Sequence, residues 1–122
     1  MSQSLEQKRA AYAWQRVNEK EVTTDYVNLA KAAPSLIMSN GLMQTLAFFK
    51  SKGKDHHNKL LEHILGWLTQ PEAACTFVTS KEFSAAMSQL ASEKITSEQY
   101  LHATQEALAI LKWIRQFAAA KG

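Results

Sequence analysis

The chain has 122 residues with a formal net charge of +3, and 46% of its residues are hydrophobic. This length suits a single folded domain, which we expect residues 1–122 to form, and the hydrophobic content excludes wholesale disorder. The lack of any run of about 20 apolar residues excludes a membrane-spanning helix, while the mild positive charge permits a nucleic-acid partner without requiring one.

Low glycine and proline content, without alternating β-branched runs, predicts an all-α chain. The first helix is expected to run from Ser4 to about Lys20, with an apolar face made of Ala10, Ala13, Trp14 and Val17. A stripe of basic residues lies beside that face, because helical spacing stacks Arg9, Arg16 and Lys20 above one another.

The second helix is expected to begin at Thr23 or Thr24, either of which can cap it, and to stop at Pro34. The residue before a proline disfavours the helical conformation, so a kink or break is predicted there. A short helical segment then ends at Asn40-Gly41, since these residue types accept the left-handed conformation that closes a helix. The sequence therefore predicts a sharp corner inside the apolar segment 33–49.

The helix after Gly41 carries Leu42, Leu46 and Phe49 on its buried face, and Phe48 points away from that face. It is expected to end at Gly53. Asp55 can cap the next helix, which should run to about Gln70 and has a core face of Leu60, Leu61, Ile64, Leu65 and Leu68.

Two pairs of residues have the spacing of a capping box near the C-terminus. Thr79 and Glu82 precede a short apolar segment, and Thr96 and Gln99 precede a long helix that should reach about Ala120. Thr96 and Gln99 give the clearer signal, because a hydrophobic pair with staple spacing flanks them.

The predicted C-terminal helix is apolar around most of its circumference. Its core face is Tyr100, Ala103, Ala107, Ile110, Leu111, Ile114 and Ala118, and Trp113 and Phe117 widen it. Such a helix is central in a bundle or is partly covered by another subunit. We therefore expect one compact bundle of about six helices around this helix, with Phe48, Trp113 and Phe117 as candidate partner contacts.

The histidines do not predict a metal site. The residues four positions after His56, His57 and His63 are leucines and a tryptophan, which do not ligate metals. His56 and His63 share a helix face but lie two turns apart, too far for one ion. We interpret all three as solvated histidines near a basic helix start.

Catalytic chemistry is not predicted either, and we expect no enzyme and no cofactor. Glu98, His102 and Glu106 recur every four residues, which is more typical of a surface stripe than of a general base. No nucleophile, phosphate-cradling glycine loop or pair of CxxC motifs accompanies them. The lone cysteine, Cys75, is expected to be a small buried side chain in a cytoplasmic protein.

Basic side chains are the better candidates for a binding site. A cluster opposed only by Asp55 contains Lys50, Lys52, Lys54 and Lys59. Together with Arg9, Arg16 and Lys20 they are candidate contacts to RNA or DNA phosphates, and such contacts give salt-sensitive, sequence-blind affinity. The alternative is an ordinary solvated lysine loop, because no aromatic stacking platform is obvious.

The corner segment also resembles a known family. Ala33-Pro34-Ser35-Leu36-Ile37, Asn40-Gly41-Leu42 and Gln44-Thr45-Leu46-Ala47-Phe48 resemble the signature of the small helical subunit, the fifth Cmr protein, of the type III-B CRISPR Cmr complex. Residues 5–14, 63–68, 100–108 and 111–118 are similar to other helices of that family. The resemblance thus extends over nearly the whole chain.

The resemblance implies a structural subunit without catalytic activity that acts in antiviral defence. Small subunits of this family stack beside the filament of guide-RNA-binding backbone subunits, and their basic faces line the channel for target RNA. The implied partners are backbone and large Cmr subunits, copies of the same chain, and the phosphates of the guide RNA–target RNA duplex. The alternative is a helical protein–protein adaptor with no nucleic-acid contact.

Overall fold

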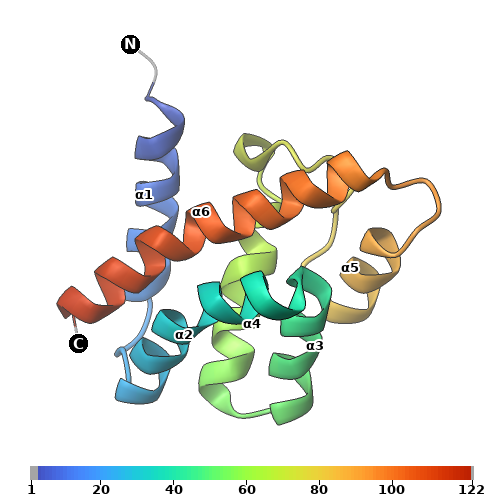
Figure 1. The fold of residues 1–122 in the computed structure, drawn as a ribbon. Helices are drawn as coiled ribbons and strands as arrows, with labels where there is room; N and C mark the ends of the chain where they lie inside the picture. The colour runs from blue at the N-terminus through green and yellow to red at the C-terminus, as the bar shows by residue number, and fades with distance from the viewer. Residues whose placement is uncertain (1–2, 122) are drawn as a thin grey trace.

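The fold, seen in a computed structural model, is described for residues 3–121 (Figure 1). Within these residues the chain forms six α-helices, one short 3-10 helix and no β-strand. The elements are α1 (Leu5–Asn18), α2 (Thr24–Asn40), α3 (Leu42–Lys52), α4 (Asp55–Leu68), η1 (Pro71–Ala73), α5 (Phe83–Leu90) and α6 (Ser97–Lys121). The predicted all-α class is confirmed.

The C-terminal helix α6 is central, as predicted, because it packs against α1, α2 and α4. Figure 1 shows it running diagonally across these helices. All predicted core positions of α6 are buried except Tyr100, which is half-buried. The Tyr100 hydroxyl accepts a hydrogen bond of 3.0 Å from the backbone N–H of Met43. This contact ties the start of α6 to the start of α3, a helix that has no side-chain cap of its own.

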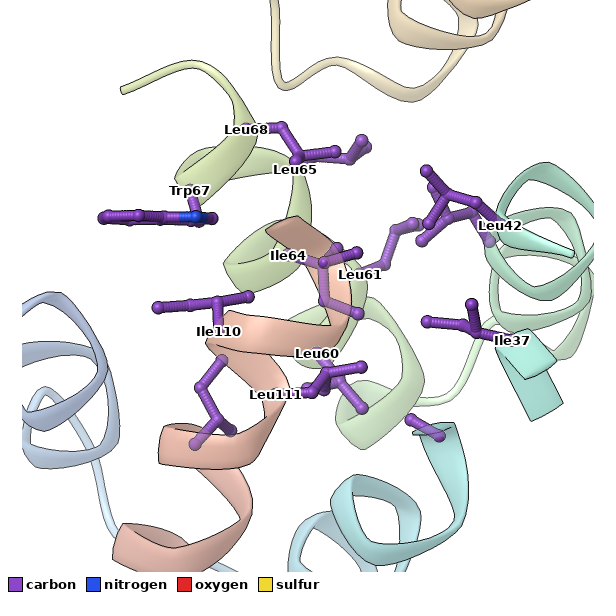
Figure 2. Close-up of a cluster of buried hydrophobic side chains, with 14 of the residues drawn as sticks. Ile37, Leu42, Leu60, Leu61, Ile64, Leu65, Trp67, Leu68, Ile110 and Leu111 are labelled. Carbon is purple, nitrogen blue, oxygen red and sulfur yellow. The ribbon is translucent and has the colours of Figure 1, made fainter. Parts of the chain in front are cut away.

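Helix α4 is enclosed by the other helices, and nine of its 14 residues are buried. All five of its predicted core leucines and isoleucines are among them. Figure 2 shows these side chains converging with Ile37 of α2, Leu42 of α3, and Ile110 and Leu111 of α6. Removal of this apolar surface from water is the main stabilising contribution to the fold.

Helix α2 continues through Pro34, so the predicted break there is wrong. A proline inside a helix removes one backbone hydrogen bond and costs roughly 3 kcal/mol. Ala30, Ala33 and Ile37 flank Pro34 and are all buried, and burial of this face against α4 and α6 offsets the loss. The predicted corner instead lies wholly at Gly41, where φ is 88° and the backbone N–H donates to the Ile37 carbonyl at 2.8 Å.

The capping box at Thr96 and Gln99 is confirmed, with reciprocal hydrogen bonds of 2.9 and 3.1 Å. The box predicted at Thr79 and Glu82 is wrong, because Glu82 itself caps α5 by accepting from the N–H groups of Ser84 and Ala85. Thr79 is paired instead with the side chain of Gln89. A carboxylate can accept both N–H groups at once, which a threonine hydroxyl does less well.

Candidate nucleic-acid interface

The turn between α3 and α4 places three of the candidate lysines at one end of the molecule (Figure 1). Lys50 and Lys52 lie in the last turn of α3, and Lys54 directly precedes α4. Between them Gly53 has a φ of 66°, in the left-handed region that favours glycine. All three lysines are exposed, and among the described residues none of them forms an ion pair.

Two of these lysines lie over aromatic rings. The Lys50 Nζ is 5.9 Å from the ring centroid of Phe83 in α5, and the Lys52 Nζ is 5.5 Å from that of Phe48 in α3. Both distances are within the range of a cation–π contact. The ammonium groups of Lys50 and Lys52 therefore lie near aromatic rings, and neither forms an ion pair with a described carboxylate.

Three other candidates, Arg16, Lys20 and Lys59, line a cleft of about 500 Å³ that residues of α1, α2, α4 and the α1–α2 connection form. Carboxylates outnumber cations on its walls: Glu19, Glu21, Asp25, Asp55 and Glu62. The Arg16 Nε lies 3.2 Å from Glu19 Oε1. The basic residues predicted as one set are thus divided, and this cleft is less suited to phosphate than the α3–α4 turn is.

Arg9 belongs to an internal network and does not extend a basic stripe on α1. Its Nη2 donates to Glu106 Oε2 at 2.7 Å, and its Nη1 donates to Glu6 at 3.1 Å. The Trp67 Nε1–H donates to Glu106 Oε1 at 3.0 Å. The Arg9 side chain is 14% exposed and that of Glu106 is 7% exposed. Since its guanidinium is committed to these carboxylates, Arg9 drops out of the candidate phosphate contacts.

The surface stripe predicted at Glu98, His102 and Glu106 is therefore wrong for two of its three members. Glu106 is buried with Arg9, and His102 Nε2 lies 2.8 Å from the backbone oxygen of Ala73 in η1. Both side chains connect α6 to other elements. Their partners come from distant parts of the chain, so spacing within α6 alone does not indicate them.

Two of the three histidines are buried, which corrects their interpretation as solvated residues. His63 Nδ1 is 2.7 Å from the Tyr26 hydroxyl, and the His63 carbonyl accepts from the Tyr12 hydroxyl at 2.7 Å. Burial, with the nearby charges of Arg16 and Lys59, lowers the pKa of His63 to about 4. His57 packs beside Phe48 and Phe49, and burial together with neighbouring cations lowers its pKa.

The remaining groups with potential chemistry are structural. Cys75 is buried, as predicted, and burial raises the pKa of its thiol to about 11. In residues 3–121, no three His, Cys, Asp or Glu side chains are grouped so that they could hold a metal ion. No helix in this part of the chain has the length and apolarity needed to cross a membrane.

Trp14, Trp113 and Phe117 form one aromatic cluster, and the sequence does not reveal that Trp14 belongs to it. Trp14, predicted on the core face of its helix, is 50% exposed. Its ring centroid is 5.2 Å from that of Phe117, which is 5.5 Å from that of Trp113. Phe48 lies elsewhere, at the α3–α4 turn, and is 43% exposed. The candidate partner contacts therefore lie on two separate surfaces.

Comparison with known proteins gives consistent matches. A family model described as "CRISPR-associated protein (Cas_Cmr5)" matches residues 5–121. The chain is 32% identical over 102 residues to "CRISPR system Cmr subunit Cmr5" of Thermotoga maritima. This alignment covers 80% of this chain and 67% of that protein. It is 32% identical over 117 residues to the protein of the same name from Thermus thermophilus, covering 91% and 90%.

A solved structure has the same fold over nearly the whole length. It is described as an X-ray crystal structure of a CRISPR-associated Cmr5 family protein from Thermus thermophilus. It aligns with a TM-score of 0.73 at 26% sequence identity and covers 98% of both chains.

Proposed function

This chain belongs to the CRISPR-associated Cmr5 family, and from that premise we propose that it is a non-enzymatic structural subunit of the RNA-targeting Cmr complex. Its partners in this proposal are the backbone and large Cmr subunits and further copies of itself. It stacks beside the guide-RNA filament and contacts target RNA through the phosphates. Guide pairing reads the sequence, so the subunit has to supply only position and charge.

The observation that carries the RNA contact is the set of exposed lysines at the α3–α4 turn. Lys50, Lys52 and Lys54 lie within five residues and form no ion pair with a described carboxylate. Ammonium groups that neutralise RNA phosphates release the cations condensed on the RNA, which gives affinity without recognition of the bases. Arg16, Lys20 and Lys59 are secondary candidates, because carboxylates share their cleft.

The internal bonding of the titratable groups supports a non-enzymatic role. Glu106 is held by Arg9 and Trp67, and His63 is bonded to Tyr26, so neither is free to exchange a proton with a substrate. Homogeneous protein should leave RNA intact, both with a divalent metal and with a chelator. Chelator-sensitive cleavage by the purified chain would overturn this part of the proposal.

The aromatic cluster of Trp14, Trp113 and Phe117 supports contact with a neighbouring subunit. Exposed aromatic side chains are enriched in protein–protein interfaces, whereas lysines are depleted there. If the chain were only a protein adaptor, this cluster would account for its whole function. The two possibilities differ in salt dependence, since only phosphate contact predicts RNA affinity that falls steeply with salt.

The test compares two triple variants that change the net charge equally. Lys50, Lys52 and Lys54 are replaced by alanine in one, and the exposed Lys8, Lys31 and Lys112 are replaced by alanine in the control. Binding to fluorescent single-stranded RNA is measured by anisotropy at several salt concentrations. The first variant should lose affinity, and the slope of log affinity against log salt should become shallower by about 2. Equal behaviour of the two variants, or affinity independent of salt, would refute the phosphate contact.

A further inference from the structure

Phe48 is an exposed aromatic ring at the basic end of the molecule. Its neighbour Phe49 is fully buried, whereas Phe48 is 43% exposed in the last two turns of α3. The Lys52 Nζ lies over the ring, 5.5 Å from its centroid, and the ring of His57 meets it edge-on with the two centroids 6.3 Å apart. A large apolar side chain is therefore presented to solvent beside a cation.

The start of α4 adds two further features at this place. The N-cap of α4 is Lys54, whose side chain only donates hydrogen bonds, and the first backbone N–H groups of α4 have no side-chain cap. His57, in the first turn of α4, is buried, and its Nδ1 has no hydrogen-bond partner among the described residues. The ring of His57, which carries this unsatisfied polar atom, thus lies beside the exposed ring, at the uncapped start of α4.

We propose that Phe48 is a stacking platform for an unpaired RNA base, and that Lys52 and Lys54 bind the phosphates on either side of that base. The inference rests on the proposed function, because it assigns a base contact to the same basic turn. An aromatic face stacks on any base, so the contact is tolerant of sequence but requires a base that is not paired. The local carboxylates, Asp25 and Asp55, do not pair with either lysine.

The charged border of Phe48 favours RNA over a protein partner. Lysines are depleted from the cores of protein interfaces, where burying an ammonium group is costly. In contrast, grooves for single-stranded nucleic acid combine aromatic rings with cations that follow the backbone. Within residues 3–121, Lys52 lies over the ring of Phe48, whereas no lysine lies over a ring of the Trp14, Trp113 and Phe117 cluster.

The test separates stacking from charge and from simple apolar contact. The full chain and its Phe48→Leu and Phe48→Tyr variants are titrated into a short single-stranded oligouridine and into an abasic oligomer of the same length. Leucine keeps an apolar side chain without a π face, and tyrosine keeps the ring. We expect Phe48→Leu to weaken oligouridine binding roughly tenfold, with Phe48→Tyr close to wild type. The salt slope should not change, and the two variants should bind the abasic oligomer equally.

Other outcomes would overturn the stacking role of Phe48. If Phe48→Leu binds oligouridine as tightly as wild type, the stacking role is overturned and the lysine contacts stand. The same holds if the substitution weakens binding to oligouridine and to the abasic oligomer equally. Loss of binding to another Cmr subunit, with RNA affinity unchanged, would make Phe48 a protein contact and also overturn it. If the wild-type chain shows no salt-dependent RNA binding, the proposed function fails and the platform fails with it. Unchanged urea midpoints would show that the variants are folded.

Discussion

Lowering the pH from 7.5 to 5 should destabilise the protein by about 2 kcal/mol through His63 alone. The imidazole is buried at the junction of α1, α2 and α4, where Nδ1 meets the Tyr26 hydroxyl. Its Nε2 is 3.9 Å from Glu19 Oε1, too far for a hydrogen bond. The charged form is therefore poorly solvated, and its other close charges, Arg16 and Lys59, are positive.

The sign and size follow from the pKa of His63, which is about 4 in the folded chain against an ordinary value of 6.5. Between these values the unfolded chain binds a proton and the folded chain does not, so acid favours unfolding. The loss begins as the pH falls below 6.5. It approaches about 3 kcal/mol near pH 4, since each pKa unit corresponds to about 1.4 kcal/mol.

Urea denaturation of wild type and a His63→Asn variant, followed by circular dichroism at pH 7.5 and pH 5, measures this contribution. Asparagine keeps a polar group near the Tyr26 hydroxyl and does not titrate. The other histidines are present in both proteins, so their effect cancels in the difference. His63→Asn should lose about 2 kcal/mol less than wild type between the two pH values. An equal loss in both proteins would refute the assignment to His63.

Three further predictions concern packing. Glu106→Ala removes the acceptor of the Arg9 Nη2 and of the Trp67 N–H and should cost about 3 kcal/mol in urea denaturation, whereas the exposed control Glu98→Ala should cost under about 0.5 kcal/mol. A Cβ at residue 66 would lie 2.5 Å from the Tyr12 hydroxyl, so Gly66→Ala should cost about 1–3 kcal/mol. That cost should shrink in a Tyr12→Phe background, and a cost that stays the same would contradict this contact. Gly41→Ala should lower the melting temperature more than Gly53→Ala does. Gly41 has φ 88° and ψ 164°, a conformation that only glycine readily adopts, whereas Gly53 lies in the left-handed region. A larger loss in Gly53→Ala would contradict this.

Helix number, type and most core faces can be predicted from local pattern. Leu60, Ile64 and Leu68 repeat with helical spacing, and Thr96 and Gln99 satisfy each other within one turn, so nothing distant is needed to place them. The prediction at Pro34 fails for the opposite reason. A proline inside a helix does cost free energy locally, but the burial of Ala33 and Ile37 of α2 against neighbouring helices outweighs this cost.

The candidate site is predictable only in part, because charge along the sequence does not reveal charge pairing in space. Lys52 and Lys54 are exposed as expected, whereas Arg9 pairs with Glu106, a residue 97 positions away. The solvated state predicted for His63 is likewise wrong, since its partner Tyr26 belongs to another helix. A buried polar side chain needs a hydrogen-bond partner, and here the tertiary fold supplies that partner from a distant part of the sequence.

The docking of α1 on α6 has a consequence for synthesis of the chain. Helix α1 leaves the ribosome before α6, the helix on which it mainly packs, and the Arg9–Glu106 pair joins the two. Until α6 has emerged, the apolar face around Ala13 and Val17 lacks its main cover. Completion of the core therefore requires the synthesis of α6, and a nascent chain that still lacks α6 presents an uncovered helix to chaperones and proteases.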